Sequence, residues 1–382
     1  MKKIIVGIIA VILIVIGVSY FGKNSNQSAV KEPIKIGFIG PLSGDAAIYG
    51  ETEKNTIQLA LDEINDNGGI NGRSISIVYE DGKCSGKDAI SAAQKLIDID
   101  KVKVILGGTC SAETLAIAPI TEKNKILLFS SFSSNPEITN SGDYVFRNSP
   151  SDIDVAKLDA ETISKLFKKV AIISENADYS QGVRTVMKSI FEKEKIAIVA
   201  DEIYSGSISD FRTILTKIKI INPDVLYVNP GSSAKAGGIV VKQARELGFT
   251  KPIHGNFYLG SLDSLNTGGK FMDAVVISDA TNLSDKGYIV LNKYKNKFGK
   301  EPAHELLMAA NYDRVYLIKE AISKNGYDAD KIKDYLYGLE MYSGLLVDYR
   351  FDKNGDVVGV LEAIGFSNYI IKDGKKLPYN PK

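Results

Sequence analysis

Short apolar runs and segments with helical periodicity alternate along most of this chain, from residue 34 onward. After the first run, the apolar residues Ile57, Ala60, Leu61 and Ile64 recur at the spacing of one helical face. The runs expected to form strands are residues 34–39, 75–79, 102–106, 125–129, 169–173, 196–199, 224–228, 251–254 and 274–277. Strands that alternate with helices pair in parallel through right-handed crossovers. The sequence therefore predicts an α/β fold.

The alternation pauses at residues 147–150 and then resumes, which predicts two similar α/β lobes. Helical segments at 306–321 and 332–339 follow later, and residues 349–351 together with 357–358 predict a β-hairpin. Small ligands usually bind in clefts at domain boundaries. We therefore expect a binding cleft between the two lobes.

Residues 4–21 form an apolar run that approaches the thickness of a bilayer, and Lys2 and Lys3 precede it. This pattern predicts a membrane-anchoring helix, with the lysines inside and the rest of the chain exported. Residues 18–21 offer no small-x-small cleavage site, so an uncleaved anchor is preferred to a cleaved signal, which would leave the protein secreted or periplasmic. No cysteine stands at the end of the run, which excludes lipid attachment. Residues 22–33 are expected to be a flexible tether, so residues 1–33 form the anchor segment.

The chain is nearly neutral, with 47 basic and 46 acidic residues, which gives no electrostatic reason to expect nucleic acid as a partner. The sequence also lacks the motifs of common enzymes. His254 and His304 are its two histidines, which is little material for a catalytic triad or a zinc cluster. The sequence has no P-loop, and Gly355 comes too early for residues 352–356 to be a calcium loop. We expect no catalysis, no metal and no cofactor.

Two cysteines occur, Cys84 and Cys110. Export to an oxidising compartment favours a disulfide between them, and two buried free thiols are the alternative. A bridge would close a loop to which the chain-entropy model assigns about 3 to 4 kcal/mol of stability.

Several motifs in the first half of the chain are similar to those of a known family. They are Gly40-Pro41-Leu42-Ser43-Gly44, Tyr49-Gly50, Asn67-Gly68-Gly69-Ile70-Asn71-Gly72, Gly107-Gly108-Thr109-Cys110-Ser111 and Asn135-Pro136-Glu137-Ile138-Thr139. In this order they closely resemble the branched-chain amino-acid-binding family of type I periplasmic binding proteins, which serve ABC transporters. The resemblance covers nearly everything after Pro33, although the second half matches mainly in architecture and in residues 178–182. The two cysteines also occupy the positions of a first-lobe disulfide found in some members.

The resemblance implies two Rossmann-like lobes joined by a three-strand hinge, with crossings expected near Ser149, Ile277 and Leu346. The first lobe would then comprise residues 34–148 and 278–345, and the second would comprise 149–277 and 346–382. It also implies a small-molecule ligand, namely an amino acid, an aromatic carboxylate or another small carboxylate, and it implies an ABC permease and its ATPase as partners. A sensing ectodomain that reports to a membrane receptor is the alternative, and an extracellular enzyme is a distant third.

The resemblance also assigns roles to individual residues. Ser111 matches the serine that binds the ligand carboxylate, at a strand-to-helix junction where free backbone N–H groups favour an anion. The alternative is that Ser111 only caps the helix. Phe132 and Ser134 match positions that present a backbone group and a hydroxyl to the ligand, and Ser133 takes that place if the register shifts by one. Tyr49 and Tyr179 match residues that cover the ligand from either side.

The sequence departs from the family at the acidic residue of the second lobe that pairs with the ligand ammonium. The matching stretch, residues 254–258, contains no carboxylate. Since an unpaired buried ammonium costs several kcal/mol, either another acid such as Asp313 reaches the ligand or the ligand has no ammonium there. Phe257 and Tyr258 instead predict an apolar or aromatic surface for the ligand.

Overall fold

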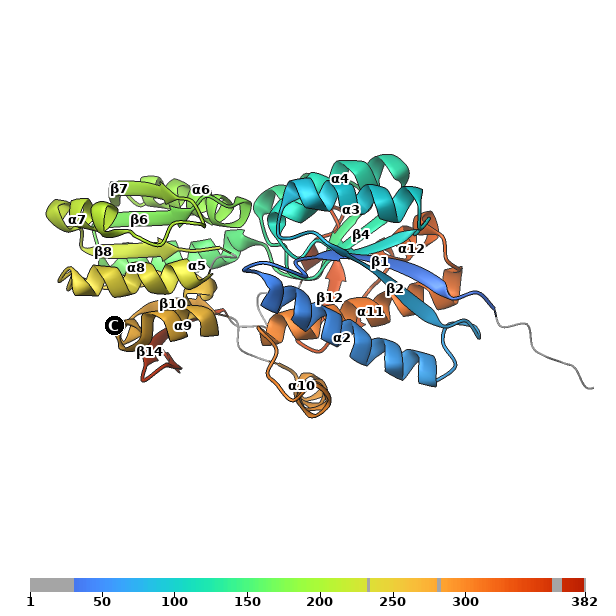
Figure 1. Ribbon diagram of the computed structural model, residues 1–382. Coiled ribbons are helices and arrows are strands. Elements are labelled where there is room, and N and C mark those ends of the chain that lie inside the picture. The colour runs from blue at the N-terminus through green and yellow to red at the C-terminus, as the bar shows by residue number, and fades with distance from the viewer. Residues whose placement is uncertain (1–30, 232–233, 280–282, 359–365, 381–382) are drawn as a thin grey trace, which may run out of the picture.

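Two α/β lobes lie side by side in the computed structural model, which describes residues 31–231, 234–279, 283–358 and 366–380 (Figure 1). Each lobe has its own sheet with helices on both faces, so the predicted α/β class is confirmed. The apolar run at residues 4–21 lies outside the described residues. Within the described ranges, no helix is long and apolar enough to cross a membrane.

The first lobe contains a parallel five-stranded sheet with the order β2-β1-β3-β4-β5. Its strands are β1 (Ile34–Gly40), β2 (Ile75–Asp81), β3 (Val104–Gly107), β4 (Leu127–Ser130) and β5 (Val145–Arg147). Its helices are α2 (Ala47–Asp66), α3 (Gly86–Asp98), α4 (Ser111–Asn124), α10 (Asp285–Phe298), α11 (Glu305–Asn325) and α12 (Ala329–Tyr337). Helix α2 packs against α11, and its predicted apolar face, with Ile57 and Ile64, is buried in the core.

The second lobe contains a seven-stranded sheet with the order β15-β14-β10-β9-β8-β6-β7. Its strands are β6 (Lys169–Glu175), β7 (Ala197–Tyr204), β8 (Val225–Asn229), β9 (Ile253–Gly255), β10 (Val276–Asp279), β14 (Ser367–Lys372) and β15 (Lys375–Pro378). Its helices are α5 (Asp152–Leu166), α6 (Asp178–Lys193), α7 (Arg212–Ile221), α8 (Ala234–Glu246) and α9 (Leu262–Gly268). Strands β6 to β10 pair in parallel, whereas β14 and β15 add an antiparallel edge.

The third crossing between the lobes differs from the expectation. Strands β11 (Tyr342–Ser343), β12 (Asp348–Phe351) and β13 (Val357–Val358) form a small antiparallel sheet that includes the predicted hairpin. This sheet packs on the first lobe, because the ring of Phe351 lies 5.6 Å from that of Phe129 and Asp356 pairs with Arg147 at 2.6 Å. The next strand, β14, belongs to the second sheet. The expectation of a crossing near Leu346 is therefore wrong, and the chain changes lobes only after Val358.

Candidate functional site

Aromatic side chains from both lobes meet in the space between them. Phe132 follows β4, and its ring centroid lies 5.8 Å from that of Phe257, which follows β9 in the second lobe. Tyr49 of α2 lies 5.6 Å from both Phe132 and Tyr258. Tyr179 of α6 contacts Tyr258 edge-on at 4.9 Å. These five residues form an interlobe aromatic cluster, and all five were predicted from the sequence to lie at the ligand.

A small cavity of about 30 Å³ adjoins the interlobe aromatic cluster. Its polar lining residues are Ser134, Ser149, Asp152, Asp279 and His304, and Phe132 and Phe257 are among its apolar ones. Such a volume has room for roughly one or two water molecules. An amino-acid-sized ligand would therefore fit into this cavity only if the rings turn or the lobes separate.

Asp152 begins helix α5 directly after the first crossing, and its backbone N–H donates to the carbonyl of Ser134 at 2.9 Å. The side chain is only 2% exposed. Burial raises the pKa of Asp152 to about 7, against the lowering effects of the Ser134 hydroxyl and the charge of Arg147. Its Oδ2 has no hydrogen-bond partner among the described residues. Sequence reasoning missed this residue, because an acid in the first turn of a helix is a common stabilising feature.

Asp279 is the second carboxyl that lines the cavity, and it is already paired. Its Oδ1 lies 3.1 Å from Nε2 of His304, and its Oδ2 pairs with Lys376. Burial opposes ionisation of Asp279, but the charges of Lys376 and His304 outweigh burial and lower its pKa to about 2. His304 belongs to the first lobe and Asp279 ends β10 of the second, so this contact joins the lobes.

Ser111 is the first residue of α4, and its hydroxyl accepts a hydrogen bond from the N–H of Asn135 at 3.3 Å. A second interlobe cavity is lined by Ser111 together with Phe132, Tyr179 and Tyr258. The helix end is capped by Glu113, whose carboxylate accepts the N–H groups of Thr109 and Cys110 at 3.0 Å each. Ser111 is therefore not needed as the cap and faces the interlobe space.

Two predicted contacts, Ser133 and Asp313, do not line these cavities. The Ser133 hydroxyl donates to the carbonyl of Gly108 at 2.8 Å and hydrogen-bonds Thr114 at 2.6 Å, so it ties two loops together. The Asp313 carboxylate accepts the backbone N–H of Leu345 at 2.9 Å. Burial raises the pKa of Asp313 to about 8. The alternative that Asp313 reaches a ligand therefore has no support in the geometry.

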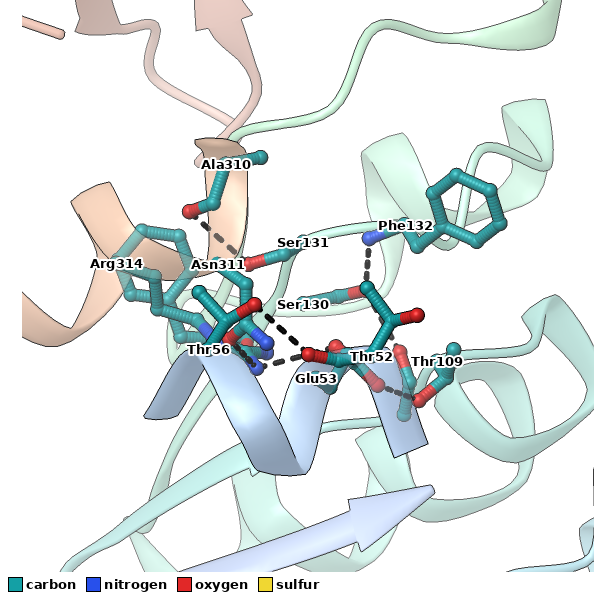
Figure 2. Close-up of polar contacts among 12 residues, drawn as sticks. Thr52, Glu53, Thr56, Thr109, Ser130, Ser131, Phe132, Ala310, Asn311 and Arg314 are labelled. Carbon is teal, nitrogen blue, oxygen red and sulfur yellow. Dashed lines mark hydrogen bonds and ion pairs between the residues drawn. The ribbon is translucent and has the colours of Figure 1, made fainter. Parts of the chain in front are cut away.

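A buried polar network holds these loops from beneath (Figure 2). Arg314 of α11 pairs with Glu53 of α2 at 3.2 Å and donates to the carbonyl of Phe129 at 2.7 Å. Glu53 in turn accepts a hydrogen bond from the hydroxyl of Thr109, two residues before Ser111. The network thus connects two helices with the loop that leads into the candidate site.

A disulfide joins Cys84 to Cys110, with Cα atoms 5.3 Å apart, as expected from the sequence. It links the segment after β2 to the residue that precedes Ser111. Glu113 reinforces this link, because its carboxylate also accepts the N–H of Cys84 at 3.0 Å. The N-terminus of α4 is therefore held in place by a disulfide and by the hydrogen bonds of Glu113.

The chain is similar to characterised binding proteins over most of its length. It is 26% identical over 341 residues to the leucine-, isoleucine-, valine-, threonine- and alanine-binding protein of Pseudomonas aeruginosa, covering 87% of this chain and 89% of that one. It is 29% identical over 351 residues to the Leu/Ile/Val-binding protein BraC3 of Rhizobium johnstonii, covering 90% and 92% of the two chains. Among solved structures, the branched-chain amino acid transporter substrate-binding protein LivJ of Streptococcus pneumoniae, in complex with isoleucine, superposes with a TM-score of 0.79 at 28% identity, covering 90% of this chain and 97% of that one.

A family profile also matches residues 33–360, which include every residue of the interlobe aromatic cluster and both ends of the disulfide. The profile is that of the periplasmic binding proteins. Two lobes with parallel sheets and an interlobe cavity are what such a protein needs to enclose a solute. The chain belongs to the periplasmic binding protein family.

Proposed function

We propose that this chain is the extracytoplasmic solute-binding protein of an ABC importer and that it encloses a small amino acid or a related carboxylate between its lobes. One observation carries the proposal. A serine at the start of a long helix, Ser111, and aromatic rings from both lobes line the same interlobe space. A ligand with an anionic end and an apolar side chain fits this combination.

Ser111 and the N-terminus of α4 would bind the ligand carboxylate, since a hydroxyl at the start of a helix and the positive end of the helix dipole favour an anion. The Ser134 hydroxyl, at the neighbouring cavity, would contact the same end of the ligand. Tyr49, Tyr179 and Phe257 would cover the ligand side chain. Relatives named for leucine, isoleucine and valine support an apolar side chain of that size.

Binding would close the lobes about the hinge and exclude water from the ligand. A permease would recognise the closed form, because the relative positions of the two lobe surfaces change with occupancy. The ATPase must be a different chain, since this sequence has no P-loop. The apolar run at residues 4–21 would tether the protein beside the permease and raise its effective concentration there. Retention in washed membranes tests the tether, and a shortened protein in the medium or periplasm would show a cleaved signal instead.

The proposal is tested by thermal unfolding of the full-length chain with L-leucine, L-isoleucine, L-valine, L-phenylalanine and benzoate. A ligand at 100 times its dissociation constant adds about 2.7 kcal/mol to the free energy of unfolding. Ser111→Ala should abolish the ligand-dependent shift, and it should also lower the unliganded melting temperature somewhat, because the buried N–H of Asn135 loses its acceptor. Ser133→Ala is the matched control, because it removes a buried hydroxyl that ties loops together: it should lower the melting temperature but keep the ligand shift. The proposal fails if no ligand stabilises the protein or if Ser111→Ala binds as well as the wild type.

A further inference from the structure

We propose that Asp152 receives the ammonium group of the ligand, so that the solute is a free amino acid rather than a simple carboxylate. This inference rests on the proposed function and names the substrate class of the same site. Residues 254–258 contain no acid, so the ammonium partner, if there is one, must come from elsewhere in the chain.

The position of Asp152 suits this role. Asp152 lines the small interlobe cavity together with Ser134 of the first lobe and Phe257 of the second lobe. Its carboxyl group is buried, and Oδ2 has no hydrogen-bond partner among the described residues. A buried polar atom without a partner normally costs about 1–3 kcal/mol. An ammonium in the cavity would satisfy that atom and supply the missing opposite charge.

The geometry also matches an α-amino acid. The Asp152 backbone N–H donates to the Ser134 carbonyl at 2.9 Å, so Asp152 and Ser134 are direct neighbours in the fold. An α-amino acid carries its ammonium and its carboxylate on the same carbon. A ligand whose carboxylate lies by Ser134 therefore places its ammonium beside Asp152.

The other charged groups near the cavity already have partners of their own. Asp279 is engaged by His304 and Lys376. Arg147, the cation whose charge reaches Asp152, is bonded to Asp356 at 2.6 Å and to the carbonyl of Asn135 at 2.9 Å. The remaining titratable groups whose pKa responds to the charge of Asp152 are Tyr179, Tyr227 and Tyr258, and burial keeps all three neutral. Among the described residues, Asp152 therefore forms no ion pair with a lysine or an arginine, although the charge of Arg147 acts on it from a distance.

The raised pKa of Asp152 gives a second readout. Near pH 7 a part of this carboxyl is protonated, and a bound ammonium favours its ionised form. Binding of an amino acid should therefore release protons from Asp152 at this pH. Calorimetry in two buffers with different ionisation enthalpies measures the number of protons released.

The test compares ligand pairs that differ in the amine: L-leucine with 4-methylpentanoate, and L-phenylalanine with 3-phenylpropanoate. Wild-type full-length protein should prefer the amine-bearing member. Asp152→Asn should weaken binding of that member about 100-fold or more, as expected when one partner of a buried charge pair is removed. It should leave binding of the deaminated member unchanged or stronger and remove the proton release.

Asp159→Asn is the matched control. Asp159 lies on the same helix, is also buried, and also has a pKa raised by burial to about 7, but it hydrogen-bonds Tyr227 at 2.6 Å and does not line the cavity. This variant should keep the preference for the amine. If wild-type protein binds both members of a pair equally, or if Asp152→Asn keeps the preference, the inference is overturned while the proposed function stands. If neither member of either pair binds, both fail.

Discussion

The guanidinium of Arg314 and the carboxylate of Glu53 form an ion pair inside the first lobe, with Nη2 and Oε1 3.2 Å apart and both side chains fully buried. The two residues are 261 positions apart in the sequence, because the chain builds the second lobe before it returns to form α11. Burial raises the pKa of Glu53 and lowers that of Arg314 to about 10, so each charge depends on the other. The pair therefore joins the two sequence-distant parts of this lobe directly beneath the candidate site.

Glu53→Gln should lower the free energy of unfolding by about 3–5 kcal/mol, because it leaves the Arg314 guanidinium buried without a counter-charge. Urea unfolding followed by circular dichroism measures the loss. Glu51→Gln on the same helix is the control: Glu51 pairs with Lys300 at the exposed surface, and loss of such a pair costs about 1 kcal/mol or less. Equal effects of the two substitutions would contradict a special role for the buried pair.

Replacing both cysteines, Cys84→Ser with Cys110→Ser, should lower the free energy of unfolding by about 3 to 4 kcal/mol, since the bridge closes a loop between residues 26 positions apart. Unfolding of the wild-type protein in the presence of a reductant should show the same loss. The double variant should not respond to the reductant. A variant that unfolds like the oxidised wild type would mean that Glu113, which also joins these loops, is sufficient to hold them.

Local patterns in the sequence were sufficient to predict the two lobes, most of their parallel strands and several helices, but not the short strand β5 or the edge strands β14 and β15. The spacing of apolar residues and the turn residues are properties of short stretches of sequence. The buried face of α2, with Ile57 and Ile64, could therefore be predicted from the sequence. The third crossing could not, because it depends on contact between Phe351 and Phe129, which lie far apart in the chain. The hairpin after Leu346 is compatible in sequence with either lobe, and its burial against the first sheet decides its place.

In the candidate site, too, residues within sequence motifs could be predicted, whereas residues whose role depends on contacts between distant segments could not. Ser111, Phe132 and Ser134 could be named because they lie within or beside recognisable motifs. Asp152 could not, because its role depends on the cavity that Ser134 and the second lobe create around it. Asp313 was a reasonable alternative as an acid on a helix, but the returning chain supplies the N–H of Leu345 as its partner.

Asp159→Asn should also change how stability depends on pH. Burial raises the pKa of Asp159 from 3.8 to about 7, above its value in the unfolded chain. The wild-type protein therefore keeps the full contribution of the protonated group below about pH 4 and loses it as the pH rises through 7, by up to about 4 kcal/mol. The amide cannot ionise and still accepts the hydrogen bond of Tyr227. Unfolding at pH 5 and pH 8 should show a smaller fall in stability for the variant, and parallel pH profiles would contradict the shifted pKa.

The contact between His304 and Asp279 should help to hold the lobes together. Nδ1 of His304 accepts the N–H of Leu306 at 3.2 Å and caps α11, and Nε2 lies 3.1 Å from Oδ1 of Asp279 in the other lobe. His304→Asn preserves the cap, because asparagine is a good N-cap residue, but its side chain is too short to reach Asp279. Without ligand, we expect a larger radius of gyration by small-angle X-ray scattering. We also expect affinity for L-leucine to be about 10 to 100 times weaker, since closure then lacks a hydrogen bond to a charged group worth roughly 1.5–3 kcal/mol. Saturating L-leucine should restore the wild-type radius. Identical scattering of variant and wild type without ligand would show that the interlobe aromatic cluster alone holds the lobes in contact.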